Sequence, residues 1–92
     1  MNEIIGLKLV SGEEIIARVV SRLGDGKILI EKPMALQMIP KQTSGYGIGL
    51  VPFVFLTQYA IELNESAIAA EYSPDVEFEK EYLTQVSGIM LQ

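Results

Sequence analysis

The side chains that most often carry out catalysis are absent from this chain of 92 residues. It contains no cysteine and no histidine. The lack of cysteine excludes disulfides, thiolate metal sites and cysteine nucleophiles. Histidine is the commonest general base and metal ligand, so its absence removes Ser-His-Asp catalysis and most zinc chemistry. No nucleophile has a visible base, and we predict that the protein is not an enzyme and uses no cofactor or metal.

Carboxylates occur together in two places. Glu13 and Glu14 are neighbours, but beside Ser11-Gly12 they are typical of a turn flank rather than of an acid/base pair. The second group lies near the C-terminus and occupies every second residue, a spacing that distributes the side chains around a helix. No glycine of a calcium-binding loop lies among them. Its members are Asp75, Glu77, Glu79 and Glu81. We interpret this group as a solvated helix face.

A glycine-rich segment occupies residues 45–49, which read Gly-Tyr-Gly-Ile-Gly. A phosphate-binding loop would end in Lys-Ser/Thr and lead into a helix, and neither feature follows here. We therefore interpret residues 40–49 as a flexible hairpin loop. Tyr46 at its tip is a candidate for stacking on a nucleic-acid base.

The charge of the chain is negative and unevenly distributed. The formal net charge is −5 at pH 7. Residues 1–41 contain six basic and five acidic side chains, whereas residues 42–92 contain one basic and seven acidic side chains. General attraction to nucleic acid depends on neutralising phosphates, so the acidic half disfavours it. Any nucleic-acid contact is expected to be local and to come from the first half.

The chain is rich in apolar residues, which make up 49% of it. That share is high for a small domain with a large wet surface, so we expect part of the apolar surface to contact other copies of the protein. No apolar segment reaches the roughly 20 residues of a membrane-spanning helix. Glu3 stands where a signal peptide would be basic. We expect a cytoplasmic protein with no membrane contact.

The period of the apolar residues predicts five short strands followed by a helix. Alternation and β-branched residues indicate strands, with turn signals at 11–12, 24–26 and 64–66. Pro33 cannot donate to a ladder, so a bend or bulge is expected there. The expected strands are 5–9, 15–20, 27–39, 50–63 with a break at 57–59, and 67–72. The fourth strand should be buried on both faces, or lie at an interface, over 50–56.

The last segment has the spacing of a helix. Ser73 is a good N-cap and Pro74 suits the first helical position, while Gly88 is a natural C-terminal stop. Phe78, Tyr82 and Val86 recur every four residues and give one apolar face. The spacing predicts a helix over 74–87 that packs this face on the strands. Met34 and Met38 should point the same way from their strand and fill the core.

Three segments of this strand pattern resemble the Sm-like family. Residues 6–19 are similar to the family's first two strands, with Ala17 where glycine is usual. Residues 31–36, Glu-Lys-Pro-Met-Ala-Leu, are similar to its Asp-x-x-Met-Asn-hydrophobic step. Residues 63–68 stand where the family has hydrophobic-Arg-Gly-x-x-hydrophobic. The likeness covers residues 5–72 and is greatest to short Sm-like proteins carried by tailed phages.

This resemblance implies a mostly β fold, a strongly bent five-stranded antiparallel barrel with a C-terminal α-helix. Residues 1–72 would form the Sm-like barrel, and residues 73–92 the helix and tail of the same single domain. The resemblance also implies a homo-oligomeric ring, in which the fourth strand of one subunit pairs with the fifth strand of the next. Residues 50–56 and 67–72 would form that seam. A phage-encoded member would work in the host cytoplasm.

The base-reading groups of the family's RNA-binding members are replaced here. Pro33 stands where those members have the residue that stacks on uracil, and Ala35 stands where they have the residue that bonds the base edge. Asn64 replaces the arginine of the later motif. A methyl group offers no donor or acceptor, and proline provides only weak stacking. The remaining candidate RNA contacts are Lys32, Asn64, Lys41, Gln42 and Tyr46.

Two functions follow from these expectations. The first is an RNA-associated ring that acts as a chaperone or matchmaker with weak base selectivity. The second is a protein-interaction scaffold with no RNA role, in which the acidic helix and the outer face bind other proteins. The family resemblance favours the first. The acidic second half and the three replaced pocket residues favour the second.

Overall fold

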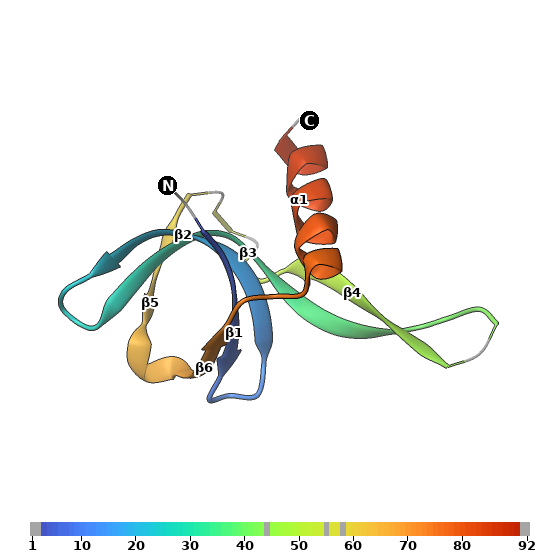
Figure 1. Cartoon of the computed structure of the whole chain (residues 1–92), viewed down its shortest axis with the longest axis horizontal. Helices are drawn as coiled ribbons and strands as arrows, with labels where there is room; N and C mark the ends of the chain where they lie inside the picture. The colour runs from blue at the N-terminus through green and yellow to red at the C-terminus, as the bar shows by residue number, and fades with distance from the viewer. Residues whose placement is uncertain (1–2, 44, 55, 58, 91–92) are drawn as a thin grey trace.

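The protein is a mostly β chain with one C-terminal helix (Figure 1). The structure, a computed structural model, describes residues 3–43, 45–54, 56–57 and 59–90. In chain order the elements are β1 (Glu3–Leu9), β2 (Glu14–Leu23), β3 (Lys27–Pro40), β4 (Tyr46–Pro52), β5 (Ile61–Asn64), the 3-10 turn η1 (Glu65–Ala67), β6 (Ile68–Tyr72) and α1 (Val76–Met90).

All strand pairs are antiparallel and belong to one curled sheet. Its order is β4-β3-β2-β1-β6, and β5 pairs with the first residues of β3. The expected fourth strand is thus divided into β4 and β5, which pair with opposite ends of β3. No ladder among the described residues joins β6 to β4 or β5, so the sheet is open between them. The antiparallel β fold with a C-terminal helix is confirmed.

The inner, concave face of the sheet carries the main core. The alternation that predicted the first strand is confirmed, because Ile5, Leu7 and Leu9 are all buried. They pack with buried aliphatic side chains from the next two strands, and half-buried residues of β5 and β6 complete the cluster. The partners from β2 and β3 are Ile15, Ala17, Val19, Ile28 and Ile30. A period of two places such residues on one side of each strand.

β3 bends at the expected proline. The register against β2 shifts between the pairs Ile16↔Met34 and Arg18↔Glu31, which marks a β-bulge on β3. Lys32 within this bulge has a φ of 50°, in the left-handed region that side chains with a Cβ rarely adopt. The bulge bends β3, so that its first half pairs with β5 and its second half leaves the body with β4 (Figure 1).

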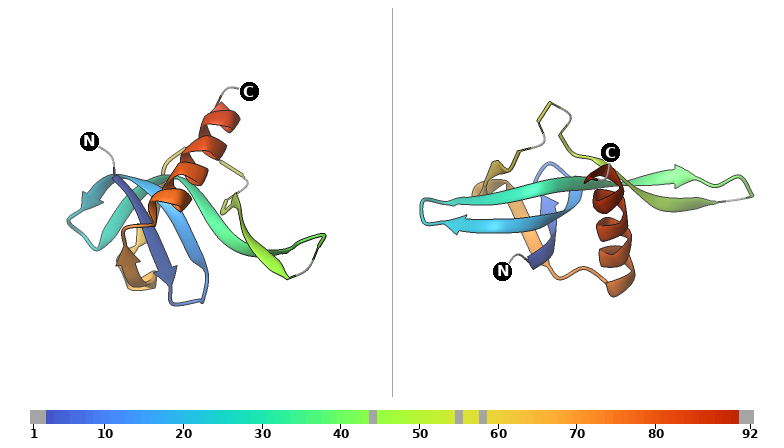
Figure 2. Two further views of the ribbon diagram at one scale, coloured as in Figure 1. Left: turned by 45° about the vertical axis from the view of Figure 1, so that its right-hand side comes forward. Right: turned by 90° about the horizontal axis from the view of Figure 1, so that it is seen from above.

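The segment expected as a flexible loop, 40–49, is mostly strand. β3 runs to Pro40 and β4 begins at Tyr46, so the hairpin connection is only residues 41–45, of which Ser44 lies outside the described residues. Gly47 pairs with Ile39, and Gly49 lies under the Ile39 side chain. The glycines therefore leave room for a side chain from the opposite strand. We call residues 36–50 of this hairpin the arm; it and the β2–β3 hairpin extend to opposite ends of the molecule (Figure 2).

The sequence predicted one buried strand over 50–56, and this prediction is wrong. β4 ends at Pro52, and Leu56 is completely exposed. Proline has no N–H for a ladder, which suits the outer edge where β4 lies. Phe55, expected in this strand, and Gln58, expected in the break at 57–59, lie outside the described residues.

Helix α1 covers part of the outer face of the sheet. Tyr82 and Val86 are buried against Ile16, Met34 and Leu50, as the spacing of the helix predicted. The helix begins two residues later than expected, because the carbonyl of Asp75, not that of Ser73, accepts the first turn's N–H, from Glu79. It also runs past Gly88 to Met90. Met38 was expected in the core but is 67% exposed, because it lies on the arm beyond the reach of α1.

Candidate interaction surfaces

The five candidate RNA contacts lie in three separate places on a single chain. Lys32 is in the bulge of β3, whereas Asn64 ends β5 opposite Lys27. Positions 27 and 32 are five residues apart along β3, which corresponds to a strand length of roughly 17 Å. Lys41, Gln42 and Tyr46 lie at the tip of the arm, and all three are exposed. One chain does not bring these residues into a common pocket.

The surroundings of Asn64 are acidic. The turn between β2 and β3 meets η1 there, since the N–H of Glu65 donates to the carbonyl of Gly26 at 2.8 Å. The ammonium of Lys27 lies 3.6 Å from the carboxylate of Glu62, so that cation is already paired. Among the described residues Lys32 and Lys41 form no ion pair within the chain. Lys8 and Lys80 also form no ion pair among the described residues, but neither is a candidate contact. Lys32 and Lys41 are therefore the candidate contacts that can pair with an anionic partner.

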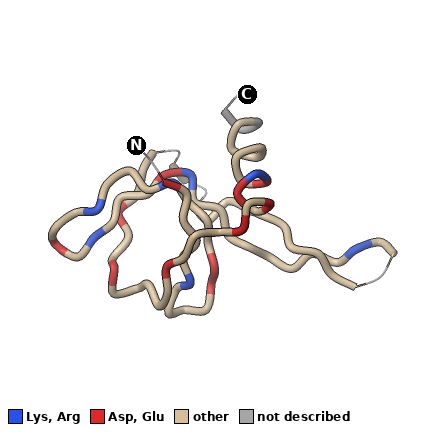
Figure 3. Tube along the Cα trace, viewed as in Figure 1, with Lys and Arg blue, Asp and Glu red and all other residues tan. Residues whose placement is uncertain are grey.

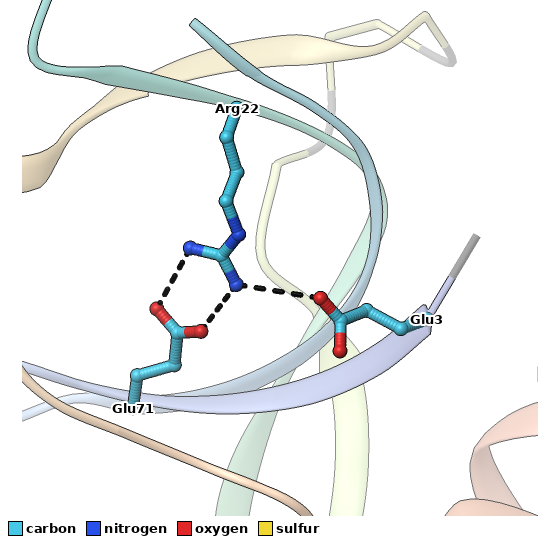
Figure 4. A network of polar contacts seen from close by, with 3 residues as sticks. All are labelled: Glu3, Arg22 and Glu71. Atoms are coloured by element: carbon cyan, nitrogen blue, oxygen red, sulfur yellow. Dashed lines mark hydrogen bonds and ion pairs between the residues drawn. The ribbon is translucent and has the colours of Figure 1, made fainter. Parts of the chain in front are cut away.

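A three-residue ionic network joins β2, β1 and β6 (Figure 4). The guanidinium of Arg22 donates to both carboxylate oxygens of Glu71 and, at 3.4 Å, to Glu3. The hydrogen bond with Glu71 is the main cause that raises the pKa of Arg22 above its ordinary value. A two-pronged arginine–carboxylate pair fixes geometry as well as charge. It ties the curled sheet together across three strands.

A hollow of about 380 Å³ lies on the outer face, between the sheet and the start of α1. Every strand of the main sheet order contributes to its floor, and the first turn of the helix and the residues before it form one wall. The lining residues are Gly6, Glu14, Ile16, Leu36, Ile48, Leu50, Tyr72, Ser73, Pro74, Asp75 and Phe78. Most of this surface is apolar. The charged side chains among the lining residues are Glu14 and Asp75, and both are acidic.

Tyr72 shapes one end of the hollow. It pairs with Gly6 across the strands, and its ring occupies the place where a Cβ at position 6 would lie. Its hydroxyl donates to the carboxylate of Glu14. Burial and this hydrogen bond raise the pKa of Tyr72 to about 12. At neutral pH the hydroxyl therefore keeps its proton and orients Glu14 as an acceptor.

The hollow continues into an exposed apolar face of the arm. Leu36, Met38, Ile48 and Leu50 alternate along the paired strands, and Tyr46 extends the row towards the tip. Met38, Tyr46 and Ile48 are 67%, 64% and 55% exposed. Lys41 is the only charged residue between positions 32 and 62, and the arm accordingly shows one cation (Figure 3). Exposed apolar surface of this extent is typical of an interaction site.

The main sheet order ends in two open strand edges, and β5, which pairs only with β3 in the described part of the chain, has an open edge as well. The outer side of β4 and the outer side of β6 have no strand partner among the described residues. Such edges present rows of unpaired N–H and C=O groups and readily add another strand. β4 carries Gly47 and Gly49, and β6 carries Ala69 and Ala70, so both edges permit close approach.

Within the described part of the chain, no cluster of three metal-ligating side chains occurs, and no helix is both long and apolar enough to cross a membrane. No protein-family model matches the chain, and no curated protein is significantly similar to it. The Sm-like resemblance therefore stays a prediction.

Sequence reasoning did not find the hollow. Glu14 was interpreted as a turn flank, and Tyr72 only as the end of a strand. The two residues meet across a distance of 58 positions in the chain. The one signal for this contact is Gly6 in a strand interior, since such a glycine often marks a site that another group approaches closely.

Proposed function

We propose that the protein is a self-assembling scaffold, in which copies join edge to edge and present their outer faces to other proteins. The observation that carries this proposal is the pair of open edges, on β4 and β6, at the two ends of the main sheet order. Both edges have small residues, and the neighbouring arm exposes an apolar face. Pairing β4 of one copy with β6 of the next would satisfy both edges and repeat around a closed ring.

Three features support an Sm-like arrangement of this scaffold. The open edges belong to the fourth and last strands of the five-strand pattern, which are the strands that the resemblance joins between subunits. The bulge at Lys32 gives the long third strand a strong bend. The ionic network of Arg22 and the hydrogen bond from Glu65 to Gly26 draw the ends of the sheet inwards, as a barrel requires.

A charge in the seam tests the assembly. Ala69 is exposed on β6, and Ala69→Glu would place a carboxylate where a neighbouring β4 strand is expected. We expect this variant to run at monomer mass in light scattering while its circular dichroism stays β-rich. Thr84→Glu is the matched control, because it adds the same charge to an exposed position of α1. Assembly that survives Ala69→Glu as well as it survives Thr84→Glu would refute the seam.

RNA association is the second candidate function, and the unpaired lysines favour it. In a ring, Lys32 and Lys41 would each repeat once per copy, and several weak phosphate contacts on one strand add up through avidity. Such binding should be weak, should fall steeply with salt, and should not select uridine, because Pro33 and Ala35 do not read a base edge.

Oligo-U and oligo-A titrations at fixed moderate salt test this second candidate. Lys32→Ala should remove most of the binding, and Tyr46→Ala should weaken it only if the arm stacks on bases. Tight binding that selects oligo-U and survives Lys32→Ala would show that another surface reads the base. If neither RNA binds at low salt, the scaffold would remain as the only one of the two candidate functions.

A further inference from the structure

We infer that the hollow on the outer face binds a lysine or arginine side chain of another protein, presented between apolar residues of an extended segment. This inference rests on the proposed scaffold function and names the chemistry of its partner. It depends on the shape, the lining and the charge of the hollow, each of which is independent of how the copies assemble.

The shape and the walls suit a long side chain with an apolar stem. The volume of about 380 Å³ lies within the range of roughly 300–1,000 Å³ that is usual for ligand sites. Leu36, Ile48, Leu50 and Phe78 offer aliphatic and aromatic contacts. Lysine and arginine bury their methylene stems against such walls while the charged end stays at the rim. Met38 and Tyr46 extend the apolar surface along the arm, where neighbouring apolar residues of the segment would lie.

The charge of the hollow selects a cation. Glu14 is half-buried and Asp75 is exposed, and no lysine or arginine is among the lining residues. The hydroxyl of Tyr72 occupies one carboxylate oxygen of Glu14 and leaves the other for a ligand. A neutral or anionic side chain would meet these carboxylates without compensating their charge.

The chain's own cations fit the hollow poorly. Lys80 stands between Glu79 and Glu81, and Lys41 stands between Pro40 and Gln42 at the tip of the arm. Neither has apolar residues on both sides in an extended segment. Lys8 and Arg18 do, in β1 and β2, but their apolar neighbours are buried in the core, so a folded copy cannot present them to a hollow. A second copy also brings a net charge of −5, which opposes an approach to an acidic rim. Charge complementarity therefore favours a basic segment of a different protein.

Three capped peptides test the inference on the whole protein: Leu-Arg-Leu, Leu-Gln-Leu and Leu-Glu-Leu. Titrations into ¹⁵N-labelled protein should shift the amide signals of the lining residues saturably with the arginine peptide. We expect the arginine peptide to bind about fivefold more tightly than the glutamine peptide, as one partly exposed ion pair allows. Equal binding of the arginine and glutamate peptides, or shifts outside the hollow only, would overturn the inference.

Single charge removals locate the effect. Glu14→Gln keeps an acceptor for Tyr72, and Asp75→Asn keeps the side-chain shape, so both should fold and both should reduce the arginine preference. Glu13→Gln makes the same charge change in the adjacent turn, where Glu13 accepts a hydrogen bond from Ser11, and should leave the preference intact. An unchanged preference in Glu14→Gln and Asp75→Asn would refute a site in the hollow.

Light scattering on the same samples separates the two proposals. Arginine-selective binding by a protein of monomer mass would support the hollow and refute the assembly. An assembled protein whose hollow signals shift with protein concentration alone, and no longer respond to peptide, would show that a second copy fills the hollow and would overturn this inference.

Discussion

Tyr82 joins the helix to the bent strand through a single hydroxyl group. Its side chain is completely buried, and the hydroxyl donates to the carbonyl oxygen of Lys32 at 2.7 Å. Burial raises the pKa of Tyr82 to about 12 from its ordinary value of 10.0. The folded protein therefore holds this proton more tightly than the unfolded chain does.

The free energy of unfolding should accordingly fall at alkaline pH. Below pH 10.0 the hydroxyl is protonated in both states, and its contribution is fully present. As the pH rises towards about 12, the unfolded chain loses the proton first, so the contribution is lost as the pH passes through the folded pKa. Urea unfolding of wild type and Tyr82→Phe near neutral pH and at alkaline pH measures this.

The comparison with Tyr82→Phe isolates the residue, because all other titrating groups are shared. We expect the variant to be less stable by about 1 kcal/mol near neutral pH, the usual net contribution of one hydrogen bond. The difference between the two proteins should shrink as the pH approaches the folded pKa. A difference that stays constant with pH would contradict this assignment.

Lys32 tests whether the bulge stores backbone strain. Its φ of 50° disfavours any residue with a Cβ, whereas glycine adopts it freely. We expect Lys32→Gly to be more stable than Lys32→Ala by about 1 kcal/mol, since both lose the same charge and only alanine keeps the strain. Chemical denaturation compares them, and equal stability would show that the backbone is not strained there.

At the scale of the elements, α1 is an addition to the outer face. It buries Ile16, Met34 and Leu50 beneath Tyr82 and Val86, while none of its described side chains belongs to the inner core. Truncation after Tyr72 should leave a β-rich protein that melts at a lower temperature and binds a hydrophobic dye, because these three side chains become exposed. Circular dichroism and thermal melting check this. Loss of all β structure would mean that the helix is part of the folding unit.

The sequence predicted the elements whose pattern is local. Alternation identified the buried face of β1, and Pro33 identified the bulge. The four-residue spacing placed Tyr82 and Val86 on the buried face of the helix. Gly49 was misleading, because a glycine in a loop and a glycine beneath a cross-strand side chain, here that of Ile39, look the same in the sequence.

The site could not be predicted in the same way. Glu14 and Tyr72 meet only because β2, β1 and β6 are neighbours in the sheet, and nothing near either residue in the sequence shows this order. Met38 shows the same limit. It has the spacing of a core residue relative to Met34, but the sequence does not reveal that the covering helix stops short of it.

At the scale of the whole molecule, β3 divides the protein into a body and an arm (Figure 2). The longest extent of the described structure is 47 Å, and the 14 residues of β3 account for about that length at roughly 3.3 Å each. The body contains nearly all of the buried apolar side chains, whereas the arm exposes Met38, Tyr46 and Ile48. A small domain has little stability to spare for an unsupported apolar hairpin, so the arm is expected to be covered by a partner, either a neighbouring copy or the bound segment of another protein.

The mass of the protein in solution tests the scaffold most directly. Size-exclusion chromatography with light scattering, at micromolar concentration and moderate salt, should give one species at a whole-number multiple of the 10.1 kDa chain mass, greater than one. The account predicts that this mass persists on dilution within the micromolar range, because each copy contributes two paired edges. A single species at 10.1 kDa under these conditions would contradict it.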